Sequence, residues 1–281
     1  MRLEDKARAG RSLEVDREAV IRAIEVNSTM TTRMLANEFD CHHSTIEEIL
    51  HEAGLKWRKI QWVPHLLTDA QKQQRVDIAT ELLEHHKEEP FLQNVITMDE
   101  TWIPFSNPNP HNAWLFPGQQ APSVPVPDFR QRKIMMSVFW GSTGVIYWEL
   151  LDRTVNSEVY CEQLDRVSRI LEEAGREEPV VFLHDNATPH TSEVTKKKLA
   201  DLDWEVLPHA PYSPDKAPSD FHLFRSFKHW LKGRRYGTID ELRAGVQAFF
   251  DSKDVDFYRR GISNLVDRWE QIIAFDGDYC D

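Results

Sequence analysis

The sequence has few cysteines and no long hydrophobic run. Only three of its 281 residues are cysteines, and Cys41, Cys161 and Cys280 lie far apart. Their spacing fits neither a disulfide framework nor a metal site and is typical of a reducing compartment. No apolar stretch approaches the roughly 18 residues that a membrane-spanning helix needs, and the first twenty residues are charged throughout. We therefore expect a soluble intracellular protein with no membrane partner.

The chain also has fewer basic than acidic residues. It contains 34 lysines and arginines against 46 aspartates and glutamates, a formal net charge of -12. A protein of this charge does not attract polyanions in general, so any contact with nucleic acid must come from local basic patches. The length allows one large domain or two ordinary ones, with a full hydrophobic core.

The apolar pattern of residues 12–57 predicts three short helices. The first follows Asp16, the second is capped by Thr31 or Thr32, and the third begins at Ser44. Only the residues FDCHH separate the last two, which fits a helix-turn-helix whose last helix lies in the DNA major groove. Many three-helix modules contact no DNA, and Glu47 and Glu48 would lie near phosphates. Both interpretations therefore stay open.

We place the first domain at residues 1–60 and expect its DNA contacts at the start of the third helix and in the basic stretch after it. These candidate residues are His43, Ser44, Thr45, Lys56, Arg58 and Lys59. Residues 61–89 are predicted to be a linker followed by a connecting helix. The linker covers 61–67, and Thr68 can cap the helix.

Residues 90–281 predict a second domain of the α/β class (an α+β mixed sheet). Its expected strands are FLQNVITMDETWI, KIMMSVFW and VIYWELL, the last two around the hairpin GSTG, then VVFLHD and WEVLP. Helices are expected from Asn156 or Ser157 to about Ala174, over 192–202, from about Pro218 to Lys232, and within 238–273. Three strands followed by alternating helices and strands predict a mixed sheet covered on both faces.

A proline-rich insert at 104–131 separates the first two strands. It contains seven of the fifteen prolines. A connection of this length without its own pattern is usually functional or disordered. The simpler interpretation is a loop packed on its own domain.

Three aspartates occupy comparable places in the predicted sheet. Asp99 lies in the first strand, Asp185 ends the fourth, and Asp220 lies in the first turn of the last long helix. The first and fourth strands are expected to be parallel neighbours, which brings the three carboxylates together. Close like charges need a counter-charge, and oxygen ligands suit Mg²⁺ or Mn²⁺, here two ions about 3.5–4 Å apart. Taken singly, each aspartate could instead cap a turn, favour a helix dipole or form an ion pair.

Basic and histidine side chains surround these positions. Lys228, Lys232, Arg234 and Arg235 follow Asp220 and could contact DNA phosphates, although a solvated helix face also explains such a run. Three histidines, His184, His190 and His209, crowd the predicted strand ends. We expect them mainly to hydrogen-bond loop backbone.

Four motifs together resemble the mariner transposases of the Tc1/mariner superfamily. They are WVPHLL, TMDETW, HDNATPH and LPHAPYSPDKAPSDFHLF, in that order, and the resemblance extends from residue 10 to 281. It implies a ribonuclease H-like catalytic domain in which Asp99, Asp185 and Asp220 hold the metal ions. It also implies a nuclear enzyme that cleaves double-stranded DNA at the terminal inverted repeats of an element and joins the ends to a TA target.

The same resemblance implies a homodimer. The linker residues Trp62, Val63, Pro64 and His65 would pack against the proline-rich clamp loop, 104–131, of a partner subunit.

The sequence departs from the family pattern at its start. Family members usually carry two helix-turn-helix units joined by a Gly-Arg-Pro-Arg segment, whereas this chain shows one unit preceded by GRSL. We therefore expect the first unit to be missing and recognition of element ends to be weak or absent. Two alternatives to a transposase stay open: a host-adopted or truncated DNA-binding protein with little or no transposition activity, and a simple metal-dependent nuclease.

Overall fold

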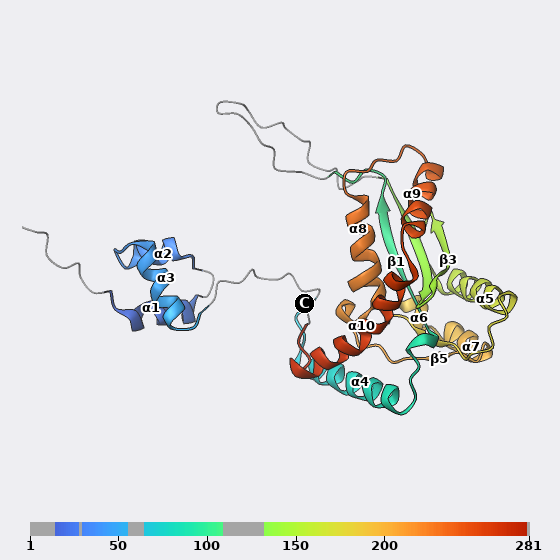
Figure 1. Cartoon of the computed structure of the whole chain (residues 1–281), viewed down its shortest axis with the longest axis horizontal. Helices are drawn as coiled ribbons and strands as arrows, with labels where there is room; N and C mark the ends of the chain where they lie inside the picture. The colour runs from blue at the N-terminus through green and yellow to red at the C-terminus, as the bar shows by residue number, and fades with distance from the viewer. Residues whose placement is uncertain (1–14, 28–29, 56–64, 109–131, 280–281) are drawn as a thin grey trace, which may run out of the picture. The chain divides into compact units, whose positions relative to one another are not determined.

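A computed structural model describes residues 15–27, 30–55, 65–108 and 132–279 (Figure 1). Contacts between Cα atoms divide the chain into two compact units, 1–62 and 63–281. No helix in the described ranges is both long and apolar enough to cross a membrane.

The first unit is a bundle of three short helices around a small apolar core. Its helices are α1 (Arg17–Val26), α2 (Thr32–Glu38) and α3 (His43–Glu52). The Asp16 side chain caps α1 and the Thr31 hydroxyl caps α2, because each accepts a hydrogen bond from a free backbone amide of the first turn. The predicted helix-turn-helix pattern is present, with α3 beginning one residue before Ser44 and capped by His42.

The second unit is a five-stranded mixed sheet with helices on both faces. The strands are β1 (Val95–Pro104), β2 (Lys133–Gly141), β3 (Gly144–Leu151), β4 (Val181–Leu183) and β5 (Glu205–Val206). The helices are α4 (Asp69–Glu88), η1 (Leu92–Asn94), α5 (Ser157–Glu173), α6 (Thr188–Thr191), α7 (Glu193–Asp201), η2 (Pro214–Lys216), η3 (Ser219–Phe224), α8 (Arg225–Leu231), α9 (Ile239–Asp251) and α10 (Val255–Ala274).

The strand order is β3-β2-β1-β4-β5. The first three strands form an antiparallel meander, whereas β4 runs parallel to β1 and β5 runs parallel to β4. The prediction that the first and fourth strands are parallel neighbours is confirmed, as is the mixed sheet. This order matters for function because it brings β1 beside the chain segment that follows β4.

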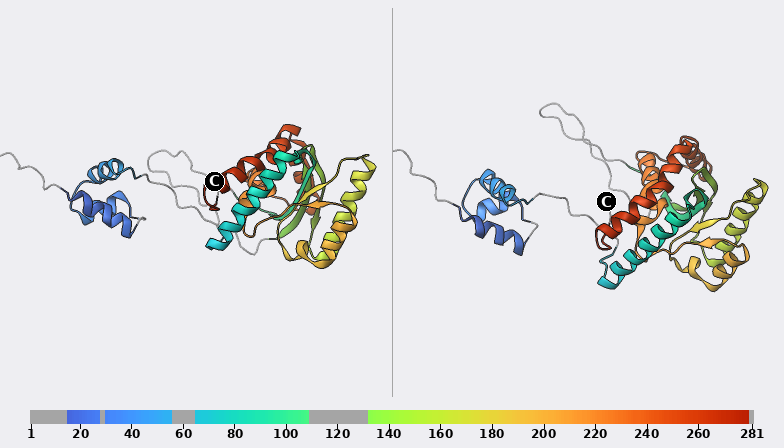
Figure 2. Two further views of the ribbon diagram at one scale, coloured as in Figure 1. Left: turned by 90° about the horizontal axis from the view of Figure 1, so that it is seen from below. Right: turned by 60° about the horizontal axis from the view of Figure 1, so that its bottom comes forward.

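Two apolar layers cover the sheet. On one face α5 and α7 pack over a core that includes Ile96, Met98 and Phe182. On the other, α10 and its neighbours bury a larger core that includes Val95, Trp140 and Trp269. The helix α4, predicted as a connection between domains, lies along α10 and belongs to this second layer (Figure 2).

Three predicted elements differ in extent. The fourth strand ends at Leu183, so Asp185 lies in the turn after the strand and not at its end. The helix expected from Pro218 begins as a π-helical turn, η3, and becomes α-helical only at Arg225. The fifth strand is only two residues long.

Candidate active site

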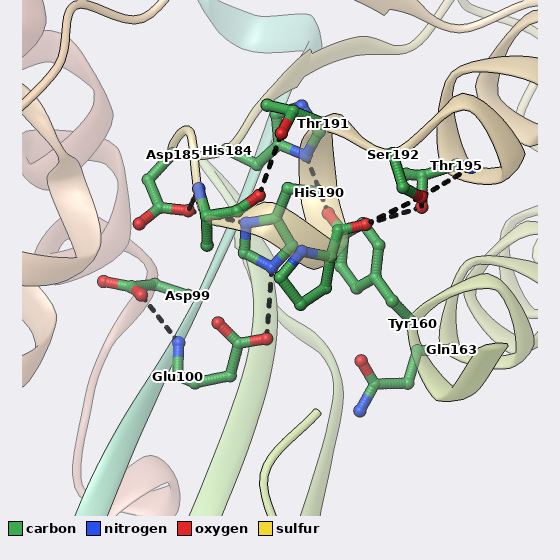
Figure 3. Close-up of polar contacts among 12 residues, drawn as sticks. Asp99, Glu100, Tyr160, Gln163, His184, Asp185, His190, Thr191, Ser192 and Thr195 are labelled. Atoms are coloured by element: carbon green, nitrogen blue, oxygen red, sulfur yellow. Dashed lines mark hydrogen bonds and ion pairs between the residues drawn. The ribbon is translucent and has the colours of Figure 1, made fainter. Parts of the chain in front are cut away.

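The strand β1 places two neighbouring carboxylates on opposite faces of the sheet, because successive side chains of a strand alternate. Asp99 points to the α10 face and accepts a hydrogen bond from the Glu100 amide at 2.7 Å. Glu100 points to the α5 face and contacts His190 (Figure 3). The pair therefore presents one carboxylate to each side of the sheet edge.

Asp185 lies beside β1 in the turn between β4 and α6. Its Oδ1 accepts hydrogen bonds from the Ala187 amide at 3.0 Å and from Nδ1 of His190 at 2.6 Å. The other oxygen, Oδ2, points away from His190 (Figure 3), and the side chain is 47 % exposed. The bonds formed by Oδ1 fix the carboxylate and leave Oδ2 accessible.

His190 joins the two carboxylates on the α5 face. Its Nδ1 donates to Asp185, and its Nε2 donates to Oε1 of Glu100 at 3.2 Å. Burial lowers the pKa of His190, but these two bonds outweigh burial and raise the pKa to about 10. Burial raises the pKa of Asp185, but the hydrogen bond from His190 and its positive charge outweigh burial and lower the pKa to about 2. The imidazolium and the Asp185 carboxylate are thus both charged at neutral pH.

Two further histidines are neutral. Burial, together with the nearby His190, lowers the pKa of His184 to about 3, and its Nδ1 accepts the hydroxyl of Tyr160 at 2.8 Å. Burial and Lys216 lower the pKa of His209 to about 3. The expectation that these histidines bond mainly to loop backbone is wrong for His184 and His190, whose rings bond to the side chains of Tyr160, Asp185 and Glu100.

Asp220 reaches the α10 face from η3. Trp140 on β2 anchors this turn, because its Nε1 donates to the Ser219 hydroxyl at 3.0 Å. Gly261 of α10 lies so close that an added Cβ would meet both Trp140 and His222 of η3 at under 3 Å. Glycine at this position lets α10 close over η3 and hold Asp220 near β1.

Asp99 and Asp220 share an excess of negative charge. Burial, together with the charges of Asp220, Glu100 and Asp185, raises the pKa of Asp99 well above its ordinary range. Burial also raises the pKa of Asp220, although Lys228 opposes this. Within the described part of the chain, neither carboxylate forms an ion pair.

The donor chemistry therefore fits a divalent cation: hard carboxylate oxygens with unbalanced charge. The geometry is not a finished ligand set, since no three His, Cys, Asp or Glu side chains of the described residues are grouped closely enough to hold a metal ion. The three aspartates are electrostatic neighbours that would have to approach one another to share a cation.

A buried ion pair fixes the loop that leads to η3. Arg75 of α4 is fully buried and forms a bidentate pair with Asp215 at 2.9 and 2.5 Å. It also donates to the Ser213 hydroxyl and to the carbonyl of Gly277. Lys216 is buried beside this pair, but its Nζ has no hydrogen-bond partner in the described structure. Burial and Arg75 lower the pKa of Lys216 to about 7.

A basic groove follows Asp220 along the chain. It has a volume of about 690 Å³ and lies between the η3–α8 segment and α10. Its cationic lining residues are Arg225, Lys228, Lys232 and Arg268. Of the other cations predicted to contact DNA, Arg234 covers the Trp230 ring and Arg235 pairs with Ser106 in an isolated bridge. The structure thus places Lys228 and Lys232 in one groove and Arg234 and Arg235 elsewhere.

The structure describes only some of the other residues predicted to contact DNA or a partner subunit. His43, Ser44 and Thr45 lie in the first turn of α3, where the Ser44 hydroxyl and His42 Nδ1 are 2.7 Å apart. His65 stacks on Tyr212. Lys56, Arg58, Lys59, Trp62, Val63, Pro64 and residues 109–131 of the clamp loop lie outside the described residues.

Comparison with known proteins gives matches over both units. Residues 17–84 match one family model described as "Transposase", and residues 105–181 match another described as "Transposase (partial DDE domain)". The second range contains none of the three aspartates. The Mariner Mos1 transposase of Drosophila mauritiana is 39% identical over 263 residues, which are 91% of this chain and 76% of that protein.

The chain belongs to the mariner transposases. Solved Mos1 structures of this family have the same fold, a helix-turn-helix unit followed by a ribonuclease H-like domain. A paired-end complex with the left transposon end has a TM-score of 0.88 at 37% identity and covers 99% of this chain and 83% of that one. A paired-end complex with Mg also has a TM-score of 0.88, at 36% identity, covering 100% and 84%.

A second relative is a longer human protein. The human Histone-lysine N-methyltransferase SETMAR is 35% identical over 286 residues, which are 99% of this chain and 42% of that protein. The chain therefore spans less than half the length of this relative.

The sequence predicted the three aspartates as site residues, which stays a prediction, and it missed Glu100, Tyr160 and the contacts of His190. A signal was present for two of them, since Glu100 adjoins Asp99 in TMDETW and His190 closes HDNATPH. The alternation of side chains along β1 hid the connection, because it sends Glu100 to the opposite face from Asp99.

Proposed function

We propose that this chain is a DNA transposase that cleaves the ends of an inverted-repeat element and joins them to a TA target by phosphoryl transfer. One observation carries the chemistry: three carboxylates from β1, the β4–α6 turn and η3 neighbour one another, and within the described structure neither Asp99 nor Asp220 forms an ion pair, so that burial raises the pKa of each. Its mariner membership and the Mos1 complexes with transposon ends support DNA as the substrate.

Asp99, Asp185 and Asp220 would hold Mg²⁺ or Mn²⁺, with two ions the proposed number. Mos1 paired-end structures with Mn and with Mg support the choice of metal. Bound there, the cations would activate water or a 3′ hydroxyl and stabilise the leaving oxygen of a phosphodiester.

Hydrogen bonds within the chain determine which carboxylate oxygens are free to bind a ligand. His190 and the Ala187 amide hold Oδ1 of Asp185, so that Oδ2 is the oxygen left for a ligand. The Glu100 amide holds Oδ1 of Asp99, and the Trp140–Ser219 bond fixes the turn that carries Asp220. Hydrogen bonds therefore orient the carboxylates of Asp99 and Asp185, and for Asp220 they fix the turn that carries it.

The basic groove along α8 would hold DNA phosphates beside this site. Arg225, Lys228 and Lys232 line it and form no ion pair within the described ranges. Lys228 also acts on the Asp220 carboxylate. A local cluster of cations without ion pairs, in a chain with net charge -12, suits a polyanion.

Pairing of two DNA ends would use a homodimer, as the paired-end complexes of Mos1 suggest. A nuclear location is part of the proposal. The segment 62–65 and the clamp loop 104–131 are the candidate contacts between the subunits.

Incubation of the full chain with labelled DNA carrying mariner inverted repeats and Mn²⁺ tests this proposal. A transposase gives cut ends and joined products, and Asp185→Ala removes both. Cut ends without joined product would support the simple nuclease instead.

The similarity to part of human SETMAR favours one second candidate, a transposase-derived DNA-binding module within a protein of another activity. Retained DNA binding without any cutting in the same assay would support this candidate.

A further inference from the structure

Asp185 has neighbours of opposite charge on the two faces of the sheet edge. On the α10 face, Asp99 and Asp220 are its negative neighbours. On the α5 face, His190 is 2 % exposed and bonds Asp185 through one ring nitrogen and Glu100 through the other. Glu100 belongs to the same strand as Asp99, so the chain His190–Glu100 ties the Asp185 turn to β1.

We propose that His190, held by Glu100, is a positioning residue that turns Asp185 so that its Oδ2 faces the cation shared with Asp99 and Asp220. This inference rests on the proposed function. Oδ1 already accepts two bonds, from His190 and from the Ala187 amide, which leaves Oδ2 as the available oxygen. Groups that hydrogen-bond a metal ligand from behind commonly orient it and tune metal affinity.

The surroundings of His190 fit a fixed orienting group. Its ring lies 4.3 Å from the ring of Tyr160 and 5.3 Å from that of His184, centroid to centroid. The Tyr160 hydroxyl is itself bonded to His184. The imidazole is therefore held by two bonds and packed against two rings, and it cannot rotate without breaking a bond to a carboxylate.

Two substitutions separate the two bonds. The side-chain nitrogen of Asn occupies the place of Nδ1, so His190→Asn keeps a donor for Asp185 and loses the contact with Glu100. The nitrogen of Gln occupies the place of Nε2, so His190→Gln keeps the contact with Glu100 and loses that with Asp185. Both remove the imidazolium charge, so they form a matched pair.

The readout is Mn²⁺ binding by the full chain. It is measured as the loss of the electron paramagnetic resonance signal of free Mn²⁺. We expect His190→Gln to lower the affinity for Mn²⁺ by roughly 10- to 100-fold. His190→Asn should lower the same affinity by at most about threefold. Thermal melting of both variants shows that each is folded. Cleavage of labelled DNA at increasing Mn²⁺ should show the Gln variant recovering activity at high Mn²⁺.

Asp99→Ala separates this inference from the proposed function. If Asp99→Ala loses Mn²⁺ while folded His190→Gln binds it like the wild type, the positioning role is overturned and the metal site stands. Equal losses in the Asn and Gln variants would also overturn it, because the bond to Asp185 would then not matter. A wild-type chain that takes up no Mn²⁺ would overturn both proposals.

Discussion

The two faces of the sheet edge balance charge in opposite ways. On the α5 face, Glu100 and Asp185 share the His190 imidazolium, and the pKa of Asp185 falls to about 2. On the α10 face, burial and neighbouring carboxylates raise the pKa of Asp99 well above its ordinary range. Among the described residues, ion pairs supply the counter-charge on the α5 face only, and on the α10 face Lys228 offsets the charge of Asp220 only in part. The difference indicates that the α10 face receives its counter-charge from outside the chain.

The same contrast recurs in the loop before η3. Arg75 and Asp215 are buried together as a bidentate pair, whereas the amine of the adjacent Lys216 is buried without a hydrogen bond to any described residue. Pairing offsets the cost of burying the Arg75 charge, whereas the buried amine of Lys216 without a hydrogen bond destabilises the fold. Four variants test how far this contrast between paired and unpaired charges holds.

The largest effect is expected at an unpaired carboxylate. Asp99→Asn keeps the acceptor for the Glu100 amide but removes the charge needed for a cation, so DNA cleavage should fall by roughly 10³-fold or more, about 4 kcal/mol in barrier. Gel assays of cleavage in Mn²⁺ measure this. A loss below tenfold would show that Asp99 is not a metal ligand.

The same substitution should stabilise the fold. Because the folded-state pKa of Asp99 lies above its ordinary value of 3.8, the folded state loses stability as pH rises through that interval. Asp99→Asn should therefore melt higher than the wild type at pH 7, and the advantage should shrink as pH falls towards 4. Equal melting temperatures at pH 7 would contradict the account of the charge excess.

Breaking the buried pair should have the next largest effect, on stability. Asp215→Asn leaves the Arg75 guanidinium buried without its carboxylate, so the free energy of unfolding should fall by about 3–5 kcal/mol. Urea denaturation measures it. Asp256→Asn, which breaks the exposed pair with Arg259, is the matched control and should cost far less. Similar losses in the two variants would remove the distinction between buried and exposed pairs.

A smaller gain is expected from removing the unpaired amine. Lys216→Met should raise the free energy of unfolding by about 1–3 kcal/mol at pH 6, because an unbonded buried donor is lost. The pKa of Lys216 is about 7 in the fold and 10.5 ordinarily, so the wild type gains stability as pH rises between these values. The advantage of Met should shrink from pH 7 to pH 10. An advantage that stays constant with pH would mean that Lys216 does not titrate there.

The smallest effect concerns the basic groove. If Lys228 and Lys232 contact phosphates, replacing both by Ala should reduce the slope of log affinity against log salt by about 1.8, or 0.9 for each phosphate. Fluorescence anisotropy with labelled DNA at several salt concentrations measures it. Lys196→Ala, which removes a cation paired with Glu193, serves as the control and should leave the slope unchanged.

The fold followed closely from the sequence because its signals are local. Thr68 and Asn156 cap the helices predicted to begin after them, and apolar runs marked the strands of the meander. The end of β4 was harder to predict. Nothing in the run VVFLHD shows that pairing with β1 stops at Leu183, since this depends on the partner strand.

The site was only partly predictable. The three aspartates follow from their places in the topology, but their incomplete convergence depends on side-chain geometry that spacing does not specify. The His190–Glu100 contact joins residues 90 positions apart, so only the packed structure shows it. The π-helical turn at Asp220 was missed for a similar reason, since Trp140 and α10 pack against it from distant parts of the chain.

Diffraction from crystals of the full chain soaked in Mn²⁺, recorded at a wavelength where manganese scatters anomalously, tests the central claim most directly. We predict anomalous density between Asp99, Asp185 and Asp220 on the α10 face, with Oδ2 of Asp185 as its ligand. Manganese bound only at other carboxylates, with this position empty at saturating Mn²⁺, would contradict the account.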